Sequence, residues 1–238
     1  MNLTIDIGNT RAKIILFEET EPIYEEVLSE SLEEAVKRII SRFHPQRCAW
    51  CNVGGNEEEV TRILTHLPLP STRLTGLTEV PIQVHYQSRA TLGADRLAAV
   101  LGATTLHPQT DLLIIDAGTC ITYDLIDAQG NYWGGNISPG LEMRLKALHQ
   151  FTARLPLVKD DGEVPPIGNN TETAIRCGVI QGITHEIEGY VSQLRQTYPH
   201  LQLFLTGGSK FNFSSPLKEE VLNDPYLVAR GLNRLLQL

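Results

Sequence analysis

The strongest constraint on this chain is a pattern of strand, Asp-x-Gly and hairpin that occurs near the N-terminus and again near the middle. In the first copy, residues 3–13 read LTIDIGNTRAK, and apolar residues alternate with polar ones in the two-residue period of a strand. Gly8 and Asn9 supply a turn to a second β-rich run over residues 12–17. The second copy, residues 112–119, reads LLIIDAGT and precedes another β-rich run. The chain is therefore predicted to restart near its middle.

The polar residues at the first turn suit a polyphosphate ligand. Asp6 precedes Gly8, whose missing side chain lets the backbone approach a ligand, and Asn9 and Thr10 add donors just beyond. Amide and hydroxyl groups can face phosphate oxygens, while the carboxylate holds a divalent ion or its waters. For one copy alone, an ordinary hairpin in which Asp and Asn favour the turn is the simpler interpretation. The second copy, with Asp116 in the same place, favours the phosphate site.

Two such units, one opening each half, resemble the nucleotide-binding fold shared by actin, sugar kinases and Hsp70 chaperones. The resemblance implies an α/β protein of two duplicated ribonuclease-H-like domains, which we place at residues 1–110 and 111–238. It also implies that ATP is held between the domains, with Asp6 and Asp116 facing each other across the metal and the phosphates.

Length and charge limit the other classes of protein. The 238 residues allow two domains of roughly 110–120 residues, each long enough for a core of its own. The net charge is −8 and no Lys/Arg cluster occurs, so the electrostatic pattern of a nucleic-acid-binding protein is missing. No apolar run approaches the ~20 residues of a membrane span, and Met1 leads into a strand rather than a signal peptide. We therefore expect a cytoplasmic protein with no nucleic-acid or membrane partner.

The cysteines predict buried free thiols rather than a zinc or redox site. Cys48 and Cys51 form a C-x-x-C pattern, but Cys120 and Cys177 are single residues in unrelated segments. In an extended segment, residues three apart point to opposite faces, which is poor geometry for a shared metal or a disulfide.

A second candidate site lies in residues 86–96. The apolar spacing that follows predicts a helix beginning near Gly93, with Asp95 in its first turn, where the helix dipole favours an ionised carboxylate. Arg96 beside it would attract an anionic substrate group. The alternative is structural, because acidic residues are common in first helical turns.

The rest of the chain predicts alternating strands and helices, as in an α/β layer. Ser31 and Asn56 are expected to cap helices over residues 32–43 and up to 67, residues 68–81 are expected to be irregular, and residues 201–206 form the last predicted strand. A long helix is expected to open at Asn169/Asn170, and Gly178 and Gly182 on it suggest that another helix, of the same subunit or of a partner, packs closely there. A homodimer is therefore a hypothesis.

Six landmarks in order make a family resemblance specific. They are DIGNT at residues 6–10, Tyr86 ahead of GADR at residues 93–96, DAGT at residues 116–119, GGNISPG at residues 134–140, Asn170 with Thr171 before Ala174, and LTGG at residues 205–208. Over essentially its whole length the chain resembles the type III pantothenate kinase family, which carries out the first step of coenzyme A synthesis.

The resemblance implies a role for each landmark. The residues it assigns to the ATP phosphates are Asp6, Ile7, Gly8, Asn9, Thr10, Arg11, Ala12, Lys13 and, in the second half, Thr119. Those it assigns to pantothenate are Tyr86, Gly93, Ala94, Asp95, Arg96 and Thr171. Asp95 would be the general base, and Thr171 would reach the substrate across the interface of a homodimer. Asp116 would bind a monovalent cation, K⁺ or NH₄⁺, and ATP would be used with Mg²⁺ or another divalent ion.

Two positions depart from the family pattern, and two other functions compete. Arg89 stands where the family commonly has proline, and Cys120 where it commonly has alanine. The competing functions are a kinase of the same fold that acts on a sugar or a small carboxylic acid, and a non-catalytic accessory protein similar to the Bvg accessory factors. The four polar residues Asp6, Asp95, Asp116 and Thr119 argue against the accessory protein, because folding alone does not require them together.

Overall fold

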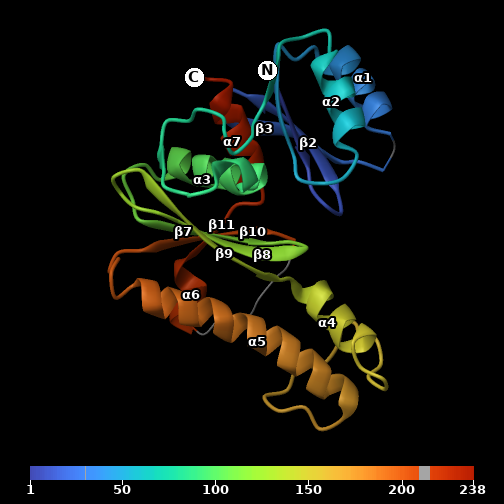
Figure 1. Ribbon diagram of the computed structural model, residues 1–238, viewed down its shortest axis with the longest axis vertical. Helices are drawn as coiled ribbons and strands as arrows, with labels where there is room; N and C mark the ends of the chain where they lie inside the picture. The colour runs from blue at the N-terminus through green and yellow to red at the C-terminus, as the bar shows by residue number, and fades with distance from the viewer. Residues whose placement is uncertain (30, 209–214) are drawn as a thin grey trace. The chain divides into compact units, whose positions relative to one another are not determined.

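The structure is a computed structural model that describes residues 1–29, 31–208 and 215–238. The chain forms two compact units (Figure 1). Unit 1 consists of Met1–Gln109, Ile126–Gly134 and Tyr226–Leu238, and unit 2 consists of Thr110–Leu125 and Gly135–Pro225. The duplicated domains at residues 1–110 and 111–238 stay a prediction, because each compact unit combines separate segments of the chain and does not correspond to one copy of the repeat. Among the described residues, no helix is both long and apolar enough to cross a membrane.

Unit 1 is built on a five-stranded sheet with the order β3-β2-β1-β4-β5. Its strands are β1 (Asn2–Ile7), β2 (Ala12–Glu18), β3 (Glu21–Val27), β4 (Arg47–Asn52) and β5 (Ser71–Arg73). The predicted hairpin is confirmed: β1 pairs with β2 in antiparallel register, with Asp6 opposite Lys13. On its other side, β1 pairs with β4 in parallel, which places Cys51 beside Asp6. β5 lies in the stretch expected to be irregular, so that expectation is wrong there.

Helices cover both faces of this sheet. Helices α1 (Leu32–Phe43) and α2 (Glu57–Thr65) cover the face that carries Leu3, Ile5 and Trp50. The Oγ of Ser31 accepts from the amide of Glu34, so this predicted N-cap is confirmed. The predicted cap at Asn56 is wrong, because Asn56 adopts a left-handed conformation and its side chain makes no capping hydrogen bond.

The opposite face of the sheet, with Ile15 and Phe17, packs against the C-terminal helix α7 (Leu227–Leu235). In turn, α7 packs closely against α3 (Ala94–Leu106) through two glycines. A Cβ at Gly231 would lie 1.9 Å from the carbonyl oxygen of Ala98. A Cβ at Gly102 would likewise lie 2.0 Å from the carbonyl oxygen of Leu227. Helix α7 therefore contacts both the first sheet and α3, the helix that begins next to Gly93.

The second sheet has the order β11-β10-β7-β8-β9-β6. Its strands are β6 (Gln83–Val84), β7 (Leu112–Ala117), β8 (Cys120–Ile126), β9 (Asn131–Pro139), β10 (Gln202–Gly207) and β11 (Val221–Asn223). β6 and the beginning of β9 pair within unit 1. β10 pairs in parallel with β7 and with β11. The expectation that residues 201–206 form the last strand is therefore wrong, because β11 follows after α6 (Ser215–Glu220).

Two further helices complete unit 2. Helix α4 (Leu141–Gln150) follows β9, and α5 (Thr171–Leu194) lies along the sheet in Figure 1. Asn170 and Thr173 form a capping box at the start of α5, as expected for a helix opened at this position. Its apolar side, including Ile183 and Ile187, joins the core with the strands. No described atom lies within 4 Å of a Cβ placed at Gly178 or Gly182, so no described part of this chain packs against these glycines.

The contact between α3 and α7 predicts opposite effects for two Gly→Ala substitutions. Gly231→Ala forces a methyl group against a backbone carbonyl, and we expect the free energy of unfolding to fall by about 1–3 kcal/mol. Gly189→Ala in α5 meets open space and gains helix propensity, so the free energy should stay level or rise by up to ~1 kcal/mol. Urea denaturation measures both, and equal effects of the two substitutions would contradict the close contact.

Candidate active site

The two Asp-x-Gly segments form similar turns, one in each unit. Asp6 and Asp116 are the penultimate residues of β1 and β7. After Asp6, the amide of Gly8 donates to the carbonyl oxygen of Arg11 at 3.0 Å, and after Asp116 the amide of Gly118 donates to that of Cys120, also at 3.0 Å. In both halves the glycine amide therefore bonds back to the chain just beyond the turn, three residues on in the first turn and two residues on in the second.

The turns leave their polar groups accessible. Asn9, Thr10 and Arg11 are exposed beyond Gly8, and Gly118 and Thr119 are exposed in the second turn. Exposed amide and hydroxyl donors next to a carboxylate at a strand end form an arrangement that can receive phosphate oxygens.

The carboxyl group of Asp6 has a strongly perturbed pKa. Burial, followed by the negative charge of Asp95, raises the pKa of Asp6 from 3.8 to about 6, against the opposing effects of Cys51 and Lys13. The Sγ of Cys51 donates to Oδ1 of Asp6 at 3.4 Å. Sequence reasoning treated Cys51 only as a buried thiol, and the position opposite Asp6 on β4 is a matter of strand register that the sequence does not show.

The cysteine prediction is confirmed for the C-x-x-C pair. Cys48 and Cys51 are buried free thiols. Burial raises the pKa of Cys48 to about 12, and burial together with the charges of Asp6 and Asp95 raises the pKa of Cys51 well above its ordinary value. Both thiols are therefore protonated at neutral pH, which makes Cys51 a hydrogen-bond donor to Asp6.

The segment predicted to bind substrate brings an aromatic ring, a guanidinium and a carboxylate together in unit 1. The guanidinium carbon of Arg96 lies 5.7 Å from the ring centre of Tyr86. The Tyr86 ring rests on Gly134, where a Cβ would lie 2.7 Å from the ring and where φ is +89°. Gly134 thus has two reasons to be glycine, the close ring and the positive φ.

Asp95 and Arg96 occupy the first turn of α3, as the sequence predicted. Oδ1 of Asp95 accepts from the amide of Arg96 at 2.8 Å, and a Cβ at Gly93 would lie 2.6 Å from this oxygen. Because Arg96 is only 5% exposed, its charge lies in a largely desolvated position. Such a turn can accept a proton at the carboxylate and bind an anion at the guanidinium.

Arg89, where the sequence departs from the family pattern, holds the neighbouring loop. Its Nε donates to the carbonyl oxygen of Gly76 and its Nη2 to that of Thr78, both at 2.9 Å. A Cβ at Gly76 would lie 2.1 Å from the carbonyl oxygen of Arg89, so the two backbones are in close contact as well. Two hydrogen bonds from the Arg89 side chain therefore hold the loop next to residues 86–96, at a position where the family commonly has proline.

Thr171, the remaining residue predicted to bind pantothenate, is the first residue of α5 and is exposed. It belongs to unit 2, whereas Tyr86 and Gly93–Arg96 belong to unit 1.

Comparison with known proteins places this protein in a known class. A family model described as type III pantothenate kinase matches residues 2–193. The type III pantothenate kinase of Bacteroides fragilis (strain YCH46) is 47% identical, over 99% of this chain and 97% of the relative. That of Porphyromonas gingivalis (strain ATCC BAA-308 / W83) is 40% identical, over 99% of this chain and 98% of the relative.

Solved structures show the same fold. A ROK family protein from Streptococcus pneumoniae TIGR4, in complex with sucrose, has a TM-score of 0.57 at 11% identity and covers 99% of this chain and 98% of its own. A Campylobacter jejuni protein assigned to the Baf family of transcriptional activators has a TM-score of 0.61 at 22% identity, with 99% and 97% covered. The α/β fold of actin, sugar kinases and Hsp70 ATPases, as predicted, is confirmed, and the molecule is a kinase of this class. Within it, the chain belongs to the type III pantothenate kinase family.

The raised pKa of Asp6 predicts a stability that depends on pH. Asp6 ionises less readily in the folded chain, so its penalty is absent below about pH 4, grows between pH 4 and 6, and is complete above pH 6. Asp6→Asn removes the charge and should raise the free energy of unfolding at pH 7.5 by about 1–3 kcal/mol, with the gain lost near pH 4. Urea denaturation in EDTA, without nucleotide, measures this gain.

Asp127 is the matched control. Burial opposes its ionisation, but hydrogen bonds from Asn131, Trp133 and the amide of Gln129 outweigh burial and lower the pKa of Asp127. Asp127→Asn should therefore lose stability at pH 7.5, and this loss should shrink as pH falls. A gain for Asp6→Asn that is the same at both pH values would show that its charge is not the cause.

Proposed function

We propose that Asp95 is the general base in the reaction of this family, the ATP-dependent phosphorylation of pantothenate to 4'-phosphopantothenate in coenzyme A biosynthesis. The observation that carries the assignment is the joint position of Asp95 and Arg96 in the first turn of α3. The primary hydroxyl of pantothenate must lose a proton as it attacks the γ-phosphorus in line with the leaving oxygen. The carboxylate of Asp95 would accept this proton.

Arg96 and Tyr86 would hold the substrate for this attack. The buried guanidinium of Arg96 matches the carboxylate of pantothenate, since a desolvated charge gains most from a charged partner. The Tyr86 ring, fixed between Arg96 and the backbone of Gly134, would limit the space available to the substrate. With Gly93 and Ala94, these residues make up the proposed pantothenate site.

The turn of residues 6–13 would bind the phosphates of ATP. Its exposed donors fit phosphate oxygens. The half-buried carboxylate of Asp6 fits a divalent ion, because burial and the charge of Asp95 raise its pKa and a bound cation would oppose both effects. A bound Mg²⁺ or similar ion supplies charge neutralisation between the phosphates. Asp6 would hold this ion or its waters, while Lys13, opposite Asp6 on the hairpin, adds a positive charge.

Unit 2 supplies the remaining proposed ligands. Thr119 would contact the phosphates through its exposed turn, and Asp116 at the end of β7 would bind a monovalent cation, K⁺ or NH₄⁺. Thr171 would reach pantothenate from a second copy of the chain. The cytoplasmic location expected from the sequence also stays a prediction.

A homodimer formed through unit 2 is supported by its exposed apolar side chains. Several large apolar residues are exposed in one stretch that precedes α5: Ile137, Met143, Phe151, Leu157, Val164 and Ile167. Phe151 and Ile167 are 80% and 84% exposed. Exposed apolar side chains that gather in one patch mark protein–protein interfaces. The open glycines Gly178 and Gly182 on α5 would allow a partner helix to approach closely.

Asp95→Asn tests the function and the base together. The amide keeps the shape of the side chain but cannot accept the proton, so kcat should fall by about 10²–10⁴-fold while ATP binding survives. ADP release with pantothenate and MgATP, in potassium or sodium salt, measures turnover, and calorimetry measures ATP binding. Wild-type turnover should require potassium.

The alternatives predict other results. A kcat that hardly changes in Asp95→Asn would remove Asp95 as the base. Turnover with sugars or other carboxylic acids but not with pantothenate would favour another kinase of the same fold. A folded chain that binds ATP but turns over no acceptor in either salt would favour an accessory protein.

Sedimentation velocity at micromolar concentration tests the dimer. We expect the wild type to sediment as a dimer and Phe151→Asp to shift toward monomer, because a charge would have to be buried at the interface. Leu77→Asp, at a 63% exposed position in unit 1, is the control and should leave the dimer intact. A wild type that sediments as a clean monomer would overturn the proposal.

A further inference from the structure

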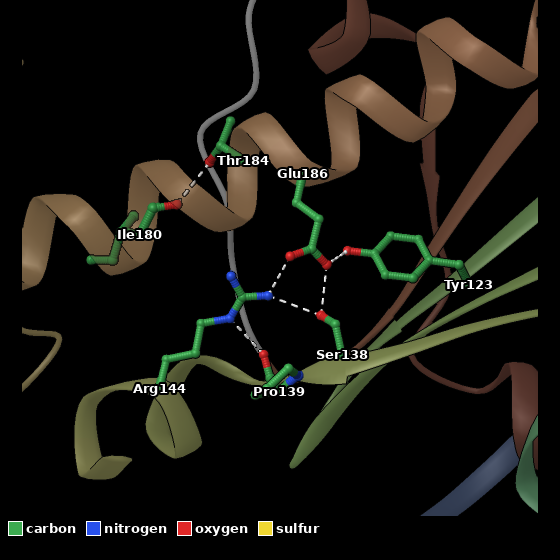
Figure 2. A network of polar contacts seen from close by, with 7 residues as sticks. All are labelled: Tyr123, Ser138, Pro139, Arg144, Ile180, Thr184 and Glu186. Carbon is green, nitrogen blue, oxygen red and sulfur yellow. Dashed lines mark hydrogen bonds and ion pairs between the residues drawn. The ribbon is translucent and has the colours of Figure 1, made fainter. Parts of the chain in front are cut away.

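A network of polar side chains in unit 2 joins four elements of the chain (Figure 2). At its centre is Glu186 of α5, whose Oε1 accepts from the hydroxyl of Tyr123 at 2.7 Å and from that of Ser138 at 2.6 Å. Its Oε2 accepts from Nη2 of Arg144 at 2.5 Å. Tyr123 lies on β8, Ser138 on β9 and Arg144 on α4, so a single carboxylate connects two strands to two helices.

Arg144 links this carboxylate to the end of β9. Its Nε donates to the carbonyl oxygen of Pro139 at 2.7 Å, and its Nη2 also donates to Oγ of Ser138 at 2.9 Å. The planar guanidinium therefore holds Ser138 and Pro139 with one rigid group. Figure 2 shows Arg144 reaching from α4 toward both residues and Glu186. The segment that precedes Gly140 is fixed by these bonds.

Gly140 connects this segment to the turn of Gly118 and Thr119. Its amide donates to the carbonyl oxygen of Thr119 at 3.1 Å. A Cβ at Gly140 would lie 2.4 Å from the carbonyl oxygen of Gly118 and 2.5 Å from that of Thr119. The backbone of Gly140 is thus in direct contact with both residues of the turn, and a shift of the 138–140 segment must shift the turn as well.

At neutral pH the network contains an ionised Glu186 and a protonated Tyr123. Burial opposes the charge of Glu186, but hydrogen bonds from Ser138, Tyr123 and Arg144 outweigh burial and lower the pKa of Glu186. Burial, together with the bond to the Glu186 carboxylate, raises the pKa of Tyr123. The side chains of Arg144 and Glu186 are 21% and 23% exposed, whereas those of the ion pair of Lys146 and Glu142 on the same helix are 64% and 79% exposed. The partly buried pair therefore constrains geometry more than the exposed pair does.

We propose that Arg144 and Glu186 are positioning residues for ATP, which act by holding the segment of Ser138, Pro139 and Gly140 against the turn of Gly118 and Thr119. The proposal rests on the proposed contact of Thr119 with the ATP phosphates. Neither charged side chain needs to touch the nucleotide. Their role is to keep the amide and hydroxyl groups of the turn where the phosphate oxygens require them.

Arg144→Lys is the decisive variant, because lysine keeps the charge beside Glu186 and loses the planar fork that reaches Pro139. We expect KM for ATP to rise by about 5–20-fold, with KM for pantothenate within about twofold of wild type. Lys146→Met, which removes the exposed ion pair from the same helix, should leave both KM values unchanged. Glu186→Gln should raise KM for ATP in the same way, and the double variant should add little, since both residues act through one network.

Hydrogen exchange gives a readout that does not depend on activity. The amide of Gly140 donates to Thr119, so its exchange should become faster by about tenfold or more in Arg144→Lys and stay unchanged in Lys146→Met. Nuclear magnetic resonance of the folded variants measures this exchange. Unchanged exchange at Gly140, or equal rises in the KM of both substrates, would overturn the positioning role.

Two further variants keep the proposal separate from folding and from the role of Thr119. If Arg144→Lys does not fold, Glu186→Gln and Gly140→Ala decide, and a normal KM for ATP in both would refute the proposal. Thr119→Val tests the phosphate contact itself. A normal KM for ATP in Thr119→Val, together with faster exchange at Gly140 in Arg144→Lys, would show that the turn is positioned as proposed but does not bind ATP through Thr119. That result would remove the nucleotide role and leave the reaction of the family in place.

Discussion

The close approach of backbone to backbone at the two glycine turns is the constraint on which the site depends. In unit 1, a Cβ at Gly54 would lie 2.6 Å from the carbonyl oxygen of Gly8. In unit 2, a Cβ at Gly140 would lie 2.4 Å from the carbonyl oxygen of Gly118. Each turn at the end of a central strand is therefore in close backbone contact with a second glycine from a later loop. Side chains are excluded at these contacts. The residues that follow Gly8, and Gly118 with Thr119, are exposed.

Around these turns, negative charge is concentrated in a way that favours function over stability. Asp6 is half buried, close enough to Asp95 for the two charges to oppose each other, and receives a hydrogen bond from the protonated thiol of Cys51. A chain selected only for stability would place neutral residues here, because an ionised buried carboxylate costs folding free energy. A divalent ion held by Asp6, as proposed above, would offset this charge. By contrast, the charges of Arg144 and Glu186 are compensated by each other and by hydroxyl groups.

Local sequence patterns predicted those elements well whose start or period follows from the physical preference of a single residue type. The alternating run before Gly8 formed β1, Gly93 preceded α3, and Asn170 capped α5. Prediction failed at Asn56, whose backbone is left-handed so that its side chain cannot cap α2, and at the short strands β5 and β11. Strands of three residues have too little pattern to recognise, and they form only because a longer neighbour, β4 or β10, offers an unpaired edge.

The sequence by itself determined the class of protein: two Asp-x-Gly turns, a helix that begins with Asp95 and Arg96, and a family pattern spread in order along the chain. These are local or sequential features, so they can be read without coordinates. The tertiary structure decided which distant residues support them. Cys51 meets Asp6 through strand register, Tyr86 rests on Gly134, Arg89 holds the carbonyls of Gly76 and Thr78, and Glu186 gathers Tyr123, Ser138 and Arg144. Such contacts depend on how elements far apart in the chain pack together, and no periodicity or spacing in the sequence records that packing.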